Sequence, residues 1–292
     1  MAIGNTTTGA LADSLPTLIA SARQVREFEG VMAQLVDKVT LPEGTGLSWN
    51  EVALAAINAQ LVTETTVLDN PQQLSDTLFT ITPTVAGVEI LITDRVAARI
   101  SKNAYAKTGG LAQNAIQRKK DEDGITVLDG GATTSSPGAG VTLTSGHIAA
   151  AVTNISSNSV EPGNPPYRCV LHGNQIKDIY DELISGVGTY PVGEGLTARV
   201  FTEGFRGMIN GAQVYEDGNI PVSADTDAKG GVFAMEAIVL VQGRSPRAVS
   251  VRKEEIGGGA TAIYHYDEYA YGERSSGNWL YEIQSDVTPP TS

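Results

Sequence analysis

The segment from residue 47 to residue 83 is rich in strand-forming residues but is only weakly apolar. Two β-prone runs, 62–67 and 77–82, flank the sequence Asp-Asn-Pro at 69–71. β-branched and aromatic residues favour strands, and Asp-Asn-Pro favours a turn. The segment therefore predicts a long two-stranded excursion. Because an isolated hairpin is only marginally stable in water, we expect this one to lie on a partner surface.

Length and composition place the chain among globular proteins. It has 292 residues, a length that suits one large domain or two intertwined ones. Apolar residues make up 41% and charged residues 18%, a composition too apolar for a disordered chain. The 20 basic and 33 acidic residues give a net charge of −13, which argues against a free nucleic-acid binder. Cys169 is the single cysteine, so the sequence predicts no intrachain disulfide, no cysteine-based zinc site and a reducing compartment. It shows no apolar run of membrane-spanning length and no signal peptide.

The first half of the chain predicts an arm, a helix and a second, longer helix. The first ten residues are small and polar, and apolar residues then recur at spacings of three and four up to Val39, which predicts a helix ended by 41–46. After the excursion, 88–92 predicts a short strand and 94–121 a long helix, kinked at Gly109-Gly110. The Gly- and Ser-rich stretch 130–140 predicts a flexible linker and a domain boundary.

The second half alternates between helices and strands, which is typical of the α+β class. Expected helices run from Thr144 or Ser145 to Ile155 and from Ile176 to Ile184, and 186–197 is a glycine-rich loop. Expected strands lie at 167–172, 213–215, 232–235, 237–241, 248–251, 264–271 and 279–283.

No catalytic constellation stands out. The three histidines lie far apart, and Gly186-Val187-Gly188 follows a helix rather than the strand that a dinucleotide loop needs. Residues 225–236 partly match a calcium loop, but Lys229 occupies a position that needs an oxygen ligand, which favours a polar loop between strands. We therefore expect no enzyme activity, no cofactor and no metal.

Four stretches, in this order along the chain, resemble recurring phrases of the tailed-bacteriophage major capsid protein, the Hong Kong ninety-seven-like fold. They are 82–94 (TPTVAGVEILITD), 127–131 (VLDGG), 168–175 (RCVLHGNQ) and 207–221 (GMINGAQVYEDGNIP). Together with the order of the expected elements, the resemblance covers nearly the whole chain.

This resemblance implies an α+β fold with four parts. They are an N-terminal arm at 1–41, a β-hairpin E-loop at 42–84, a P-domain with a long spine helix at 85–135 and 242–292, and an α+β A-domain at 136–241. The implied function is structural: the chain assembles into hexamers and pentamers of an icosahedral shell around the phage genome. The expected location is the virion, with assembly in the host cytoplasm.

The resemblance also implies partners and contact residues. Besides copies of itself, the chain is expected to meet a portal, a decoration protein and, because only about 40 residues precede the E-loop, a separate scaffolding protein. It would enclose DNA without sequence-specific binding and would need no membrane. No residue matches the Lys–Asn cross-link of some relatives. Expected assembly contacts are Leu18, Val25, Phe28, Trp49, Leu68, Asp69, Arg99, Gly188, Tyr190 and Gly193.

Two other readings remain open at this point. Encapsulins, the shell proteins of bacterial nanocompartments, share the implied fold. A β-rich adhesin or carbohydrate-binding protein would explain the Thr-rich strands and scattered tyrosines, but it would not need a long helix.

Overall fold

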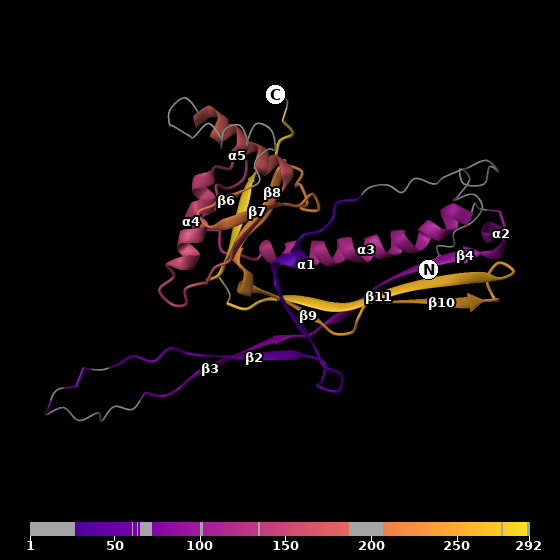
Figure 1. Cartoon of the computed structure of the whole chain (residues 1–292), viewed down its shortest axis with the longest axis horizontal. Coiled ribbons are helices and arrows are strands. Elements are labelled where there is room, and N and C mark those ends of the chain that lie inside the picture. The colour runs from indigo at the N-terminus through magenta and orange to yellow at the C-terminus, as the bar shows by residue number, and fades with distance from the viewer. Residues whose placement is uncertain are drawn as a thin grey trace.

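The described residues form two five-stranded sheets, a projecting hairpin and the helices that accompany them (Figure 1). The structure is a computed structural model. It describes residues 27–59, 61–62, 64, 72–99, 102–133, 135–186, 207–275 and 277–290, with the backbone alone at 102–107 and 184–186.

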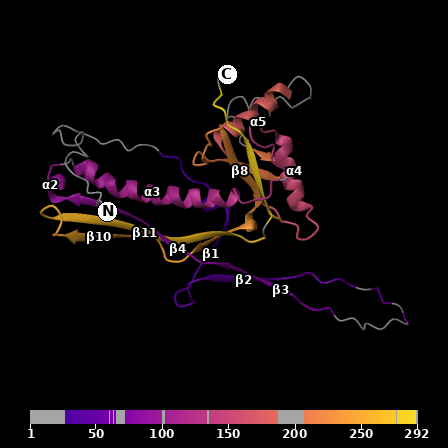
Figure 2. The ribbon, with the colours of Figure 1, turned by 180° about the vertical axis from the view of Figure 1, so that it is seen from behind.

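The first sheet is built around β11, a strand of 14 residues. Along one edge β11 pairs antiparallel with β4, and along the other edge it pairs with β10 and then with β9, which in turn pairs parallel with β1. The strands are β1 (Asp37–Thr40), β4 (Thr84–Thr93), β9 (Ile238–Gln242), β10 (Arg247–Lys253) and β11 (Ala260–Glu273). The long helix α3 (Lys102–Leu128) lies along one face of this sheet, as both views show (Figures 1 and 2).

The second sheet forms a separate lobe at one end of α3 (Figure 1). Its strand order is β12-β8-β5-β7-β6, and only β5 and β7 run parallel. The strands are β5 (Tyr167–Leu171), β6 (Met208–Ile209), β7 (Ala212–Glu216), β8 (Asp227–Ala234) and β12 (Leu280–Asp286). Helices α4 (Ser145–Ser156) and α5 (Gly173–Gly186) belong to the same lobe.

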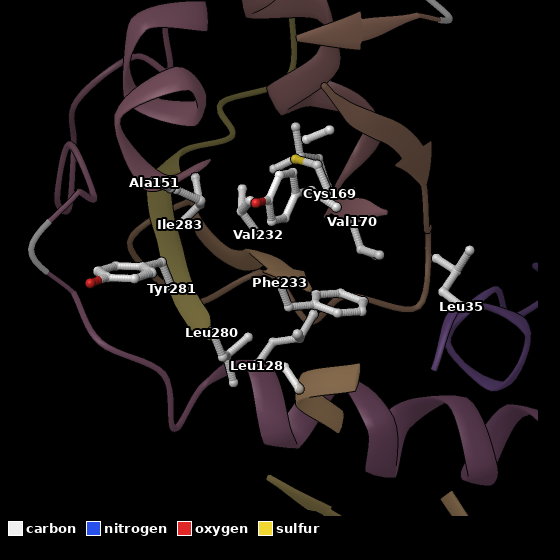
Figure 3. Packing of buried hydrophobic residues seen from close by; sticks show 14 of the residues in the cluster. Leu35, Leu128, Ala151, Cys169, Val170, Val232, Phe233, Leu280, Tyr281 and Ile283 are labelled. Carbon is white, nitrogen blue, oxygen red and sulfur yellow. The ribbon is translucent and has the colours of Figure 1, made fainter. Parts of the chain in front are cut away.

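The last turn of α3 joins the two lobes. Leu128 is fully buried and lies beside Phe233 and Leu280 of the second sheet (Figure 3). A side chain at Gly231 would come within 3.1 Å of the Leu128 side chain. Cys169 lies in the same cluster, and its burial raises the pKa of its thiol. The largest core therefore extends across the boundary between α3 and the second sheet.

Within the described ranges, a hairpin and three short helical segments complete the fold. Strands β2 (Trp49–Leu54) and β3 (Asp76–Ile81) pair antiparallel and project from the body on the side opposite α3 (Figures 1 and 2). The short segments are α1 (Met32–Leu35), α2 (Asp94–Ala97) and the 3₁₀ helix η2 (Met235–Ala237).

Most elements of the second lobe are confirmed. The helix expected from Thr144 is α4, with Thr144 as its N-cap in a capping box with His147. The expected strand at 167–172 is β5, and the helix that follows it is α5. The later strands are confirmed as β7 to β12, mostly one to four residues longer than expected.

The expected N-terminal helix is wrong in its last turn. The helix α1 ends at Leu35, and Asp37–Thr40 forms a strand. The reason is long-range pairing, because Asp37 lies opposite Val239 in a parallel ladder that the local 3.6-residue periodicity cannot reveal. The earlier part of the expected helix lies outside the described residues.

The expected long helix is wrong in its limits. The helix α2 ends at Ala97 and α3 begins at Lys102, and α3 continues through Gly109-Gly110 and past Asp121 to Leu128. The acidic residues 121–123 do not end the helix, because two of them have partners: Met32 N–H donates to Asp121, and Lys119 pairs with Asp123.

One expectation about an irregular segment is also wrong, and another lies mostly outside the described residues. The first strand of the hairpin is 49–54, which pairs directly with 76–81, whereas most of the expected strand at 62–67 is not among the described residues. The expected flexible linker at 130–140 is tied along β12: Ala132 exchanges two main-chain hydrogen bonds with Leu280 and Glu282, and Gly138 donates to Gln284.

Candidate functional site

One face of the hairpin exposes apolar side chains. The strand register places Val52, Leu54 and Leu78 on this face, and they are 54%, 72% and 64% exposed. Towards the tip, Ile57, Leu61, Val62 and Leu74 are exposed as well. A run of apolar side chains left in water on a projecting hairpin is typical of an interaction surface. We call these seven residues the hairpin surface.

The opposite face of the hairpin is anchored at its base. Trp49 and Phe79 make an edge-to-face contact with ring centroids 6.0 Å apart. Ile81 packs with Val239 and Val241 of β9 in a small buried cluster. A side chain at Gly272 would come within 2.6 Å of Ile81, so β11 passes very close to the hairpin base.

A polar fork lies beside this apolar anchor. Arg274 donates from Nε to Glu51 Oε2 at 2.7 Å and from Nη2 to Asp37 Oδ2 at 3.0 Å. Its Nη1 donates to the main-chain oxygen of Glu236 at 2.8 Å. The guanidinium also lies 6.0 Å from the centre of the Trp49 ring.

The first sheet has one face that α3 does not cover. Asp267 and Tyr269 point towards α3, because Lys120 pairs with Asp267 at 3.0 Å and Tyr269 donates to Asp123 at 2.8 Å. Alternation along β11 then places Tyr264 and Tyr266 on the other face, together with Val249 opposite Tyr264. We call this the open sheet face, with the residues Arg247, Val249, Val251, Tyr264 and Tyr266.

Aromatic and basic groups form a ladder on the open sheet face. The rings of Tyr264 and Tyr266 stack at 5.9 Å with an interplanar angle of 5°. Arg247 lies 5.4 Å from the Tyr266 ring and Lys253 lies 5.2 Å from the Tyr264 ring. Glu89 accepts hydrogen bonds from Lys253 and Tyr264, which lower the pKa of that carboxyl.

A buried carboxyl pair seats the N-terminal segment on α3. Asp121 and Asp217 are 2% and 1% exposed. Asp121 accepts from Met32 N–H at 3.0 Å and from Asn219 Nδ2 at 2.9 Å, and Asn219 N–H donates to Asp217 Oδ1 at 2.9 Å. Burial, and then the hydrogen bond to Asp121, raise the pKa of Asp217 to about 7. A side chain at Gly30 would overlap Asp121, so the chain passes directly over the pair.

The structure places three of the expected contact residues on separate parts of the molecule. Phe28 is 65% exposed and lies against Gly218 of the second lobe, whereas Trp49 lies at the hairpin base. Arg99 is exposed directly after α2, at the far end of α3. The remaining seven expected contacts lie outside the described residues; they are Leu18, Val25, Leu68, Asp69, Gly188, Tyr190 and Gly193.

Sequence reasoning missed Arg274, Asp217 and the open sheet face. The acceptors that bind the Arg274 side chain lie 38 to 237 residues away in the sequence. Asn219, which lies two residues after Asp217, donates to Asp121 across a separation of 98 residues. The alternation of Tyr264, Tyr266 and Val249 was visible in the sequence, but it does not show which face α3 covers.

The described residues contain no group of three or more His, Cys, Asp and Glu side chains that could hold a metal ion. Within the partial calcium loop, Asp227 begins strand β8 and accepts from Gly140 N–H, while Lys229 pairs with Asp129. Among the helices in the described part of the chain, none is long and apolar enough to cross a membrane.

Comparisons with solved structures identify the fold. The chain is similar to a structure of Mycobacterium phage Che8 (TM-score 0.72, 15% identity, 97% of this chain and 98% of the other). It is also similar to the head structure of Helicobacter pylori bacteriophage KHP40 (TM-score 0.73, 11% identity, 99% and 100%) and to the capsid of a native GTA particle (TM-score 0.69, 12% identity, 97% and 100%). No protein-family model matches the sequence, and no curated protein matches it. The α+β fold is therefore that of phage capsid structures, as the resemblance implied.

Proposed function

We propose that this chain is a structural shell protein that assembles with copies of itself into hexamers and pentamers of an icosahedral phage head. The observation that carries the proposal is the hairpin surface, which remains exposed on a chain whose fold matches head and capsid structures over nearly its full length. A hairpin without a core of its own is stabilised when a neighbouring molecule covers it.

The open sheet face is the proposed receptor for the hairpin of a neighbouring copy. Val249 and Val251 are apolar and exposed there, as Leu54 and Leu78 are on the hairpin. The charges are complementary as well. Arg247 lies on the open sheet face, and Asp76 lies on the same face of the hairpin as Leu54, its cross-strand partner. A contact between two different faces of one chain is heterologous, and it closes into rings when the rotation is right.

The remaining parts of the proposal concern the assembled particle. The net charge of −13 disfavours tight capture of DNA, so the shell encloses the genome without reading its sequence. The chain acts without catalysis. It assembles in the host cytoplasm, with scaffolding, portal and decoration proteins as partners, and is then located in the virion.

The proposal keeps the four-part division of the chain with three changes that the sheets favour. Residues 280–286 join the A-domain, because β12 pairs with β8. Residues 238–241 join the P-domain, because β9 pairs with β11, and residues 37–40 follow them, because β1 pairs with β9. The hairpin is the E-loop, and α3 is the spine helix.

Electron microscopy of the purified chain tests the proposal. We expect uniform shells, or hexamers and pentamers, from the full chain and a folded subunit without shells from a chain that lacks 55–72. The double variant Leu54→Asp and Leu78→Asp should lose assembly, whereas the control Val160→Asp, at an exposed apolar residue of the second lobe, should retain it. Shells from the deletion variant, or stable monomers of the full chain at high concentration, would overturn the proposal.

A further inference from the structure

Arg274 lies where the two lobes and the hairpin meet. The chain crosses between the sheets at 235–237, from β8 to β9, and again at 274–279, from β11 to β12. Arg274 joins these crossings twice, because its N–H donates to Ala237 O at 2.8 Å and its Nη1 donates to Glu236 O at 2.8 Å.

The same side chain holds the base of the hairpin. Its Nε donates to Glu51 in β2 and its Nη2 donates to Asp37 in β1. The three donor nitrogens lie in one rigid plane, so acceptors from three chain segments fix the orientation of one group. Asp37 and Glu51 supply two negative charges around the guanidinium of Arg274, whose side chain is 18% exposed.

The rest of the hairpin base is apolar. Ile81, Phe79 and Trp49 pack on β9 and β11, and such contacts depend on buried area rather than on direction. Hydrogen bonds are directional and weaken steeply when they bend. The apolar cluster therefore acts as the pivot of the hairpin, and the polar fork sets its angle.

We propose that Arg274 is a positioning residue that fixes the direction in which the β2–β3 hairpin leaves the body and couples that direction to the second lobe. A shift of the lobe moves Glu236 and Ala237, and Arg274 transmits it to Glu51. In a shell the hairpin angle sets the angle between neighbouring subunits, so Arg274 governs particle curvature; this consequence rests on the proposed function, whereas the positioning of the hairpin does not.

Arg274→Met tests the inference, because methionine keeps an apolar stem over Trp49 and removes the donors. Arg274→Lys restores the charge without the planar fork. The matched control is Arg252→Met, since Arg252 also pairs with two carboxylates, those of Asp94 and Glu254, but lies on β10 away from the hairpin. Two measurements are made on each full chain: amide hydrogen exchange in β2, β3 and β5, and the particle diameters in electron micrographs.

We expect Arg274→Met to exchange about tenfold faster in β2 and β3 while β5 keeps its wild-type rates. The particles of Arg274→Met should vary in diameter. Arg274→Lys should give exchange rates and diameters between those of Arg274→Met and the wild type, and Arg252→Met should match the wild type in both. Wild-type exchange in β2 and β3 of Arg274→Met would overturn the inference, and so would equal acceleration in β5, which indicates a general loss of stability. If the wild type forms neither rings nor shells, the proposed function fails, and the exchange rates alone decide whether Arg274 positions the hairpin.

Discussion

The buried pair of Asp121 and Asp217 should make the stability of the protein depend on pH. Oδ2 of Asp217 is buried without a hydrogen-bond partner in the described structure, and the neighbouring Asp121 carboxyl raises the pKa of Asp217. A proton on Asp217 that is donated to Asp121 would give Oδ2 a partner. Asp217→Asn keeps the shape and an N–H donor but removes the titration, so it isolates the effect of that proton.

The size of the effect follows from the pKa of Asp217, which burial and Asp121 raise from 3.8 to about 7. Between these values the folded state holds a proton that the unfolded state has lost, so stability falls as pH rises. The slope is about 1.4 kcal/mol per pH unit, and the full span amounts to on the order of 4 kcal/mol. The nearby hydroxyl of Tyr271 stays neutral throughout, because burial raises its pKa further.

Chemical denaturation of the full chain at fixed concentration measures this difference. From about pH 5 to about pH 7, the free energy of unfolding of Asp217→Asn should gain about 2 kcal/mol relative to the wild type. The control Asp181→Asn removes a carboxylate that pairs with Lys177 on the surface of α5, and its profile should run parallel to that of the wild type. Parallel profiles for Asp217→Asn as well would refute the shared proton.

Three further predictions concern single substitutions to alanine. Leu128→Ala should lower the free energy of unfolding by about 3 kcal/mol, measured by denaturation, because it opens a cavity between α3 and the second sheet. Gly109→Ala should raise the melting temperature, because a side chain there meets no atom within 4 Å and alanine favours a helix by about 1 kcal/mol over glycine. Gly230→Ala should instead lower it sharply, because its Cβ would overlap the carbonyl oxygen of Val170.

The sequence predicted elements whose pattern is local. Helix α4 has a capping residue and apolar residues at helical spacing, and β5 is a short run that is apolar except for Arg168, so both were found within about a residue of their limits. Strand β1 was missed because its apolar residues also fit a helix, and only its pairing with β9, some 200 residues later, decides between the two.

The limits of α3 and the candidate site depended on tertiary contacts. The helix was expected to end at Asp121, but α3 continues through Gly124, which makes room for Met32, since a side chain there would lie 2.8 Å from the Met32 Cβ. The overall order of elements was sufficient for the fold. Arg274 lies in no motif, and the 207–221 stretch that contains Asp217 does not indicate the partner of that carboxyl. Their roles arise from partners that only the folded chain brings together.

The arrangement of strands explains why the hairpin is the part that needs a neighbour. Strands from both ends of the described chain are built into the sheets, β1 beside β9 and β12 beside β8, so each lobe is stabilised within the subunit. The hairpin pairs only with itself beyond its base and leaves Leu54 and Leu78 in water. Burial of these side chains is favourable only when another molecule supplies the surface, so that part of the stability depends on subunit concentration. In the proposed assembly, a subunit that is complete in its lobes and incomplete in its hairpin folds first and gains its remaining stability from its neighbours.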